Sequence, residues 1–83
     1  MARKYAIANA TRMSNDICED FGKRLRYLRT KQGWSQEELA YRVGMDVSYL
    51  SELENGHKEP CLIKIKELAQ GLGIPLATLV RGL

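Results

Sequence analysis

Cysteine and histidine are scarce in this 83-residue chain, which contains two cysteines and one histidine. Cys18 and Cys61 are too few and too far apart in the sequence for a disulfide framework or a zinc site. We expect both to be free thiols in a reducing cytoplasm; a disulfide that links two subunits or senses oxidants is the alternative. His57 has no cluster of cysteines or acids beside it, so the sequence predicts no metal site.

Long hydrophobic runs are also absent. No stretch approaches the roughly 20 apolar residues that a membrane-spanning helix requires. The N-terminus lacks the apolar core of a signal peptide, so the sequence indicates a cytoplasmic protein with no membrane partner. The formal net charge is only +3, which is compatible with nucleic acid but does not identify it.

Catalytic motifs are missing as well. The serines have no histidine at a plausible geometry, there is no glycine-rich phosphate loop, and the acidic residues are spread over amphipathic stretches where solvation explains them. We therefore expect no enzyme, no cofactor and no small-molecule ligand. A chain of this length forms one small domain that buries about 60–65% of its unfolded surface.

Residues 1–14 show no sustained hydrophobic period, which predicts a flexible N-terminal arm: either a solvated tail or an arm whose basic residues touch phosphates. Residues 15–83 are expected to form the folded domain. From Asn15 to Lys31 the apolar residues recur at spacings of four and three, which predicts a helix. Gly22 favours a start of its regular part near Asp20, and Gly33 closes it.

The rest of the chain repeats this helical pattern, and nothing in it is typical of a strand. The expected fold is a compact all-α bundle of five short helices. The four further helices are expected over residues 36–43, over residues 47–55, from Pro60 to the glycines at 71 and 73, and from Pro75 onward.

The segment 36–55 predicts two short amphipathic helices joined by a tight turn. Gly44 stands where the chain must enter a left-handed conformation, which only glycine adopts cheaply. Ala40 is small where two helices must cross, and Leu50 and Leu53 form the apolar stripe of the second helix. This is the pattern of a helix-turn-helix, whose second helix enters the DNA major groove.

The start signals of these two helices are redundant. Ser35 and Glu38 have the spacing of a capping box, and Trp34 and Leu39 have that of a hydrophobic staple. Asp46 is a favoured N-cap for the second helix.

These residues resemble the Cro / lambda-repressor type of helix-turn-helix, the XRE family. The resemblance covers about residues 21–80 and rests on FGKRLRYLRTKQGWSQEELA, on the spacing AxxxGxxxxxL, on LENG and on LxxIxxLAxxLGI. It implies a five-helix domain that binds a two-fold double-stranded DNA operator as a homodimer and regulates transcription. The length and the LIKI and IPLATL segments are similar to restriction–modification controller proteins; prophage repressors and antitoxins are similarly small.

The resemblance also implies roles for particular residues. Arg29 stands where the family often buries an arginine against a glutamate, here Glu54, so we expect a bidentate pair between helix one and the recognition helix; two exposed charges are the alternative. Gln36 stands where family members hold a phosphate. The expected base contacts are Val47, Ser48, Ser51 and Glu52, and the expected phosphate contacts are Gln36, Tyr49, Asn55, His57 and Lys58.

Two features complicate a DNA-binding function. The recognition surface contains no arginine or lysine, so it lacks the commonest specific contact to guanine, and Asp46 and Glu52 are negative beside a polyanion. A protein-interaction module of antitoxin or adaptor type is therefore the alternative function. An apolar patch is expected to hold the second subunit, although scattered surface hydrophobics would give the same pattern; it consists of Ile63, Leu76, Leu79 and Val80, with Leu83.

Overall fold

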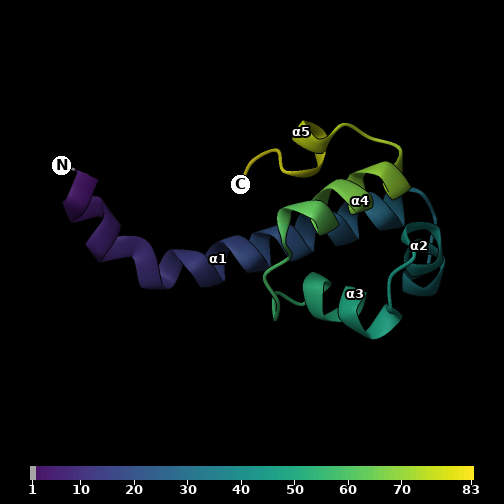
Figure 1. The fold of residues 1–83 in the computed structure, drawn as a ribbon, viewed down its shortest axis with the longest axis horizontal. Coiled ribbons are helices and arrows are strands. Elements are labelled where there is room, and N and C mark those ends of the chain that lie inside the picture. The colour runs from purple at the N-terminus through teal and green to yellow at the C-terminus, as the bar shows by residue number, and fades with distance from the viewer. Residues whose placement is uncertain (1) are drawn as a thin grey trace.

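The computed structural model describes the backbone of residues 2–83 and the side chains of residues 17–83. All regular elements in this part of the chain are helices, as the sequence predicted (Figure 1). They are α1 (Ala2–Lys31), α2 (Gln36–Val43), α3 (Val47–Glu54), α4 (Leu62–Leu72) and α5 (Leu76–Leu79).

Helix α1 is the axis on which the other helices assemble. In Figure 1, α3 lies on one side of α1, α4 and α5 lie on the other, and α2 lies beyond its C-terminal end. Contacts of α1 with α3 and α5, and of α2 with α3 and α4, enclose a core made mostly of leucines. The fully buried members are Leu25, Leu39, Leu50, Leu53, Leu68 and Leu79.

The start of α1 differs from the prediction. The helix begins at Ala2, not near Asn15 or Asp20. Residues 2–14 include four alanines and no glycine or proline, so their composition favours a helix even though they lack a hydrophobic period. The predicted flexible arm covers residues 1–14, whose side chains lie outside the described part of the structure. The flexibility of this arm therefore stays a prediction.

Gly22 lies within α1 because α3 crosses the helix there. A Cβ atom at this position would lie 2.6 Å from the carbonyl oxygen of Leu53 and closer still to that of Glu54. Only a residue without a side chain lets the two backbones approach to this distance. The glycine that the sequence analysis treated as a weak point of the helix is therefore a packing requirement.

Local capping sets the boundaries of α2 and α3. The Ser35 hydroxyl accepts a hydrogen bond from the Glu38 N–H (3.1 Å), and Gly44 ends α2 with φ of 68°. Glu38 does not complete the predicted box, because its carboxylate pairs with Arg42 at 2.8 Å. Asp46 occupies the predicted N-cap position of α3, but its side chain makes no capping hydrogen bond.

Candidate nucleic-acid interface

Helix α3 presents a buried face and an exposed face. Leu50, Leu53 and Glu54 point into the domain, whereas Ser48 and Glu52 are exposed and Ser51 is half-buried. This division agrees with the predicted recognition surface except at its N-terminal end.

Val47 and Tyr49 lie at the boundary between the buried and exposed faces of α3. Both are half-buried and pack against the leucine core. Because an apolar side chain at the start of α3 gains more from the core than from water, Val47 is drawn inward. The base contact of Val47 therefore stays a prediction, and only the exposed part of this half-buried side chain is free for it.

The negative charge of Glu52 has a basic neighbour. The Lys58 ammonium lies 3.9 Å from its carboxylate, and both side chains are about half exposed. An exposed pair at this distance contributes at most about 1 kcal/mol to stability. It nevertheless places one positive charge beside the acid, in the loop after α3, where His57 and Lys58 are both exposed.

The Glu54 carboxylate joins three helices. Its Oε2 accepts a hydrogen bond from Arg29 Nε at 2.6 Å, and its Oε1 accepts one from the Arg29 Nη2 at 2.9 Å. The predicted bidentate pair is therefore present, with a fully buried Glu54 side chain. Oε1 also accepts from Gln36 Nε2 at 3.0 Å and from Arg26 Nε at 3.4 Å, and Arg29 Nη1 donates to the Trp34 carbonyl at 2.8 Å.

These contacts decide the ionisation of the pair. Burial by itself raises the pKa of Glu54, but the hydrogen bonds from Arg29, Gln36 and Arg26 and the positive charge of Arg29 outweigh it, so this pKa lies below its ordinary value. The hydrogen bond to Glu54 raises the pKa of Arg29 against the opposing effect of burial. Both groups are therefore charged in the folded domain near neutral pH.

Gln36 has a structural partner that the sequence did not reveal. Its side-chain nitrogen donates to Glu54, and the residue is half-buried. The predicted role as a free phosphate contact is thus incomplete. Gln36 holds the N-terminus of α2 to the C-terminal turn of α3, and only its remaining amide atoms are available to a ligand.

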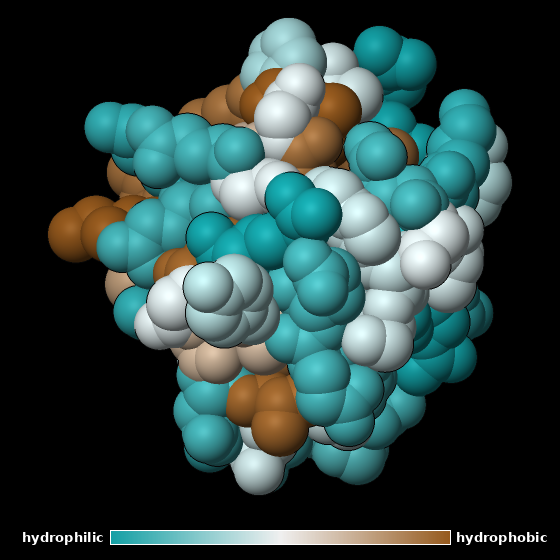
Figure 2. Space-filling model, turned by 90° about the vertical axis from the view of Figure 1, so that its right-hand side faces the viewer, coloured by the Kyte–Doolittle hydropathy of each residue, from teal (hydrophilic) through white to brown (hydrophobic). Residues whose placement is uncertain are grey.

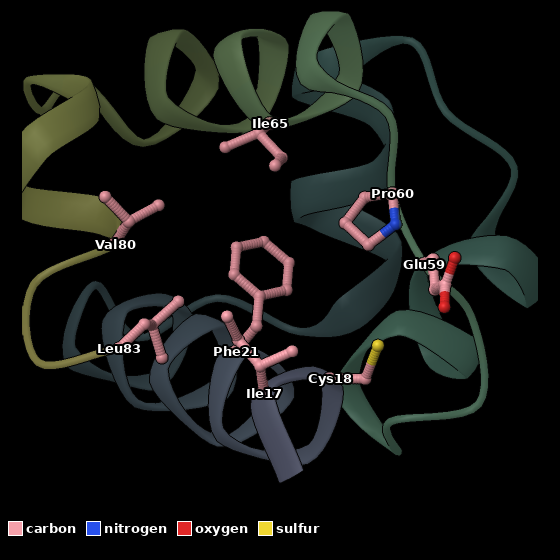
Figure 3. Close-up of a pocket in the computed structure, with 8 residues that line it drawn as sticks. All are labelled: Ile17, Cys18, Phe21, Glu59, Pro60, Ile65, Val80 and Leu83. Carbon is pink, nitrogen blue, oxygen red and sulfur yellow. The ribbon is translucent and has the colours of Figure 1, made fainter. Parts of the chain in front are cut away.

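The opposite side of the domain carries an apolar hollow of about 480 Å³ (Figure 3). Side chains from α1, from the loop before α4, from α4 and from the C-terminal turn point toward its centre. Its walls are almost wholly apolar apart from Cys18 and Glu59; they comprise Ile17, Cys18, Phe21, Glu59, Pro60, Ile65, Val80 and Leu83.

The structure leaves some of the predicted subunit contacts accessible and buries one of them. Ile63 is 67% exposed and Leu76 is 39% exposed, and Val80 lines the hollow. Leu79, in contrast, is fully buried, so its prediction as an interface residue is wrong. Arg24 Nη2 donates to the Thr78 carbonyl at 2.7 Å, and this link from α1 holds α5 with Leu79 inward.

The surface at the α2 end of the molecule is different in character. Figure 2 shows it as mostly hydrophilic, with hydrophobic side chains in separate places. The Arg42 guanidinium stacks over the Trp34 ring there, 4.0 Å from its centroid, which covers much of the indole with a polar group.

Both cysteines are free thiols. Cys61 is exposed, and burial at the hollow, followed by the charge of Glu59, raises the pKa of Cys18. Within the part of the chain that the structure describes, no helix is long and apolar enough to cross a membrane. Among the same residues, no three or more histidine, cysteine or acidic side chains lie together in a way that could hold a metal ion.

Comparison with known proteins gives consistent results. A helix-turn-helix family model matches residues 25–79. Control protein C.MunI from Mycoplasma sp is 39% identical over 66 residues, 78% of this chain and 89% of that protein. The crystal structure of the restriction-modification controller protein C.AhdI from Aeromonas hydrophila superposes with a TM-score of 0.73 and 44% identity, over 75% of this chain and 94% of that one.

Proposed function

The chain belongs to the XRE-type helix-turn-helix family of DNA-binding transcription regulators, and we propose that it acts as a homodimer on a two-fold operator, in the manner of a small controller protein. Controller proteins of restriction-modification systems are among its relatives of similar length. A regulator of this kind works in the cytoplasm, without a cofactor, and responds to its own concentration through dimerisation and operator occupancy.

The observation that carries this proposal is the buried attachment of α3. Glu54, at the C-terminal end of α3, is fixed to α1 and α2 by four hydrogen bonds, while Ser48 and Glu52 remain exposed on the other face. A rigid helix with an exposed polar face meets the requirement for reading base edges in a major groove.

Base reading falls mainly to the exposed residues of α3. The Ser48 hydroxyl donates or accepts at either strand, and the Glu52 carboxylate accepts from a cytosine amino group. Ser51 and the accessible part of Val47 complete the proposed surface. Asn55, His57 and Lys58 follow α3 and are exposed, which supports their proposed contacts with phosphates. Tyr49 and Gln36 have less surface free for such contacts.

The apolar side of the domain supports dimerisation. The hollow and the exposed side chains of Ile63 and Leu76 leave hydrophobic surface in water, which a second copy would cover. In a two-fold dimer the two α3 helices enter successive major grooves about 34 Å apart. Ile63, Leu76, Val80 and Leu83 remain in the proposed interface, and the exposed Leu62 is added.

The proposal is tested by selecting binding sites from a random duplex library with purified protein, at low and moderate salt. We expect a two-fold symmetric site whose log affinity falls by roughly 0.9 units per phosphate contact for each log unit of salt. On the selected site, Ser48→Ala should weaken discrimination at one base pair by roughly 5- to 150-fold, equivalent to about 1–3 kcal/mol.

The control is Thr30→Ala, whose hydroxyl donates only to carbonyls of its own helix, and it should keep the wild-type base preference. Enrichment of no site at either salt would overturn the proposal and favour a protein-interaction module. Enrichment of a site without two-fold symmetry would keep the regulator and reject the dimeric operator.

A further inference from the structure

Arg26 contacts two consecutive residues at the end of the recognition helix. Its Nε lies 3.4 Å from Glu54 Oε1, and its Nη2 donates to Asn55 Oδ1 at 3.1 Å. The second contact bridges α1 and the C-cap of α3 at the surface, because Asn55 is exposed and the Arg26 side chain is 51% exposed.

The chemistry of this contact fixes which end of the Asn55 amide faces outward. A guanidinium group has donors and no acceptor, so the amide must turn its oxygen toward Arg26. The Nδ2 group, with two N–H donors, is then directed away from the arginine. A phosphate oxygen accepts hydrogen bonds and repels a carbonyl oxygen, so this orientation is the one that binds the DNA backbone.

The backbone that carries Asn55 is fixed as well. The Gly56 N–H donates to the Leu53 carbonyl at 3.1 Å, and the His57 N–H donates to the Glu52 carbonyl at 2.9 Å. Gly56 has φ of 76°, and a Cβ there would lie 2.9 Å from the Glu19 side chain. With the backbone closed in this way, the remaining freedom of Asn55 lies in its side-chain torsions, which set the amide orientation.

We propose that Arg26 is a positioning residue for DNA binding, which orients the Asn55 amide so that its N–H groups meet a phosphate beside the C-terminal end of α3. This proposal rests on the proposed function. Preorganised donors bind more tightly because the cost of ordering them is already met in the free protein. A second, more polar hollow is lined by Glu19, Lys23, Arg26, Glu54 and Asn55. Lys23 adds positive charge to the proposed phosphate site there, and Glu19 opposes it.

The first experiment needs no DNA. In wild-type protein we expect the Asn55 side-chain amide to show a heteronuclear NOE close to that of the backbone, and Arg26→Lys should lower it. Lysine keeps the positive charge near Glu54 but lacks the planar fork that reaches both acceptors. The matched control is Arg81→Lys, an exposed arginine in the C-terminal turn, which should leave the Asn55 signal unchanged.

The second experiment measures affinity for the selected operator. Arg26→Lys should weaken binding by about 3- to 10-fold, the value of one hydrogen bond, and by the same factor on operators with altered bases, since a phosphate contact carries no sequence information. Asn55→Ala should weaken binding similarly, and adding Arg26→Lys to it should cost less than a further 2-fold. The melting temperature should stay within the range of the Arg81→Lys control.

Asn55→Asp separates positioning from simple stabilisation. Aspartate pairs with Arg26 more strongly but has no donor, so we expect DNA binding at least as weak as in Asn55→Ala together with an unchanged or higher melting temperature. Wild-type affinity in Asn55→Asp, or additive losses in the double variant, would overturn the positioning role while leaving the regulator intact. Failure of wild-type protein to bind any duplex would overturn both.

Discussion

Replacing Glu54 with glutamine removes one negative charge from the middle of the domain and changes almost nothing in volume. Both carboxylate oxygens accept hydrogen bonds, and Arg29 supplies a donor to each. Glutamine keeps one acceptor and places an NH₂ group against a donor of Arg29. The variant therefore leaves a buried guanidinium without its counter-charge, which costs about 3–5 kcal/mol.

For a domain of this size each kcal/mol shifts the melting temperature by about 4–8 °C, so we expect a fall of roughly 12–40 °C at pH 7. The assay is thermal unfolding followed by circular dichroism at fixed protein concentration, because the proposed dimerisation would make the midpoint concentration-dependent.

Glu52→Gln is the matched control: that carboxylate is about half exposed and 3.9 Å from its lysine, so the expected change is below about 1 kcal/mol. Replacing Arg29 with Met and Glu54 with Leu together should recover much of the loss, since an apolar pair of similar volume is often as stable as a buried ion pair. A Glu54→Gln midpoint within a few degrees of wild type would refute the reasoning.

Three further predictions concern the same framework. Gly22→Ala should destabilise the domain by about 1–2 kcal/mol in urea unfolding, because the contact with the α3 carbonyls outweighs the gain in helix propensity. Wild-type stability should fall on acidification, because the folded pKa of Glu54 lies below its unfolded value of about 4.3. The stabilisation from ionised Glu54 is complete above the unfolded pKa and is lost as the pH drops through the folded pKa. Glu54→Gln should lack this part of the pH dependence. Leu79→Ala should cost about 2–5 kcal/mol in unfolding experiments because Leu79 is core, while Ile63→Asp should leave unfolding of the monomer unchanged and weaken self-association in sedimentation equilibrium more than 10-fold; equal effects on stability would contradict the assignment of the two residues to core and surface.

The parts of the fold that the sequence predicted are those with local causes. The limits of α2 follow from Ser35 and Gly44, each of which acts within a few residues of the helix end. The Arg29–Glu54 pair was implied by the family resemblance. Its two charges must be buried together, because either charge buried alone would be strongly destabilising. The limits of α2 need no knowledge of how distant segments meet, whereas the ion pair joins α1 and α3 and was known from the resemblance alone.

Most of the errors have a different origin, because they depend on contacts across the fold. Gly22 is explained only by the crossing of α3, and Gln36 only by the position of Glu54. Leu79 lies in a four-residue helix, in which hydrophobic spacing does not separate an inner face from an outer one. The start of α1 was missed for another reason: residues 2–14 favour a helix by composition and have no apolar period to indicate it.

The same network also explains how a helix with acidic residues can serve as a DNA reader. Helix α3 contains Glu52 and Glu54 and no basic residue, so its own charge opposes the approach of a polyanion. Burial and pairing with Arg29 remove the charge of Glu54 from the surface, and Lys58 partly compensates Glu52. With little net attraction left on the helix, we expect affinity to depend on donors that are already in place when the DNA arrives. Substitutions that loosen the Glu54 network should therefore weaken operator binding more than removal of any single exposed cation.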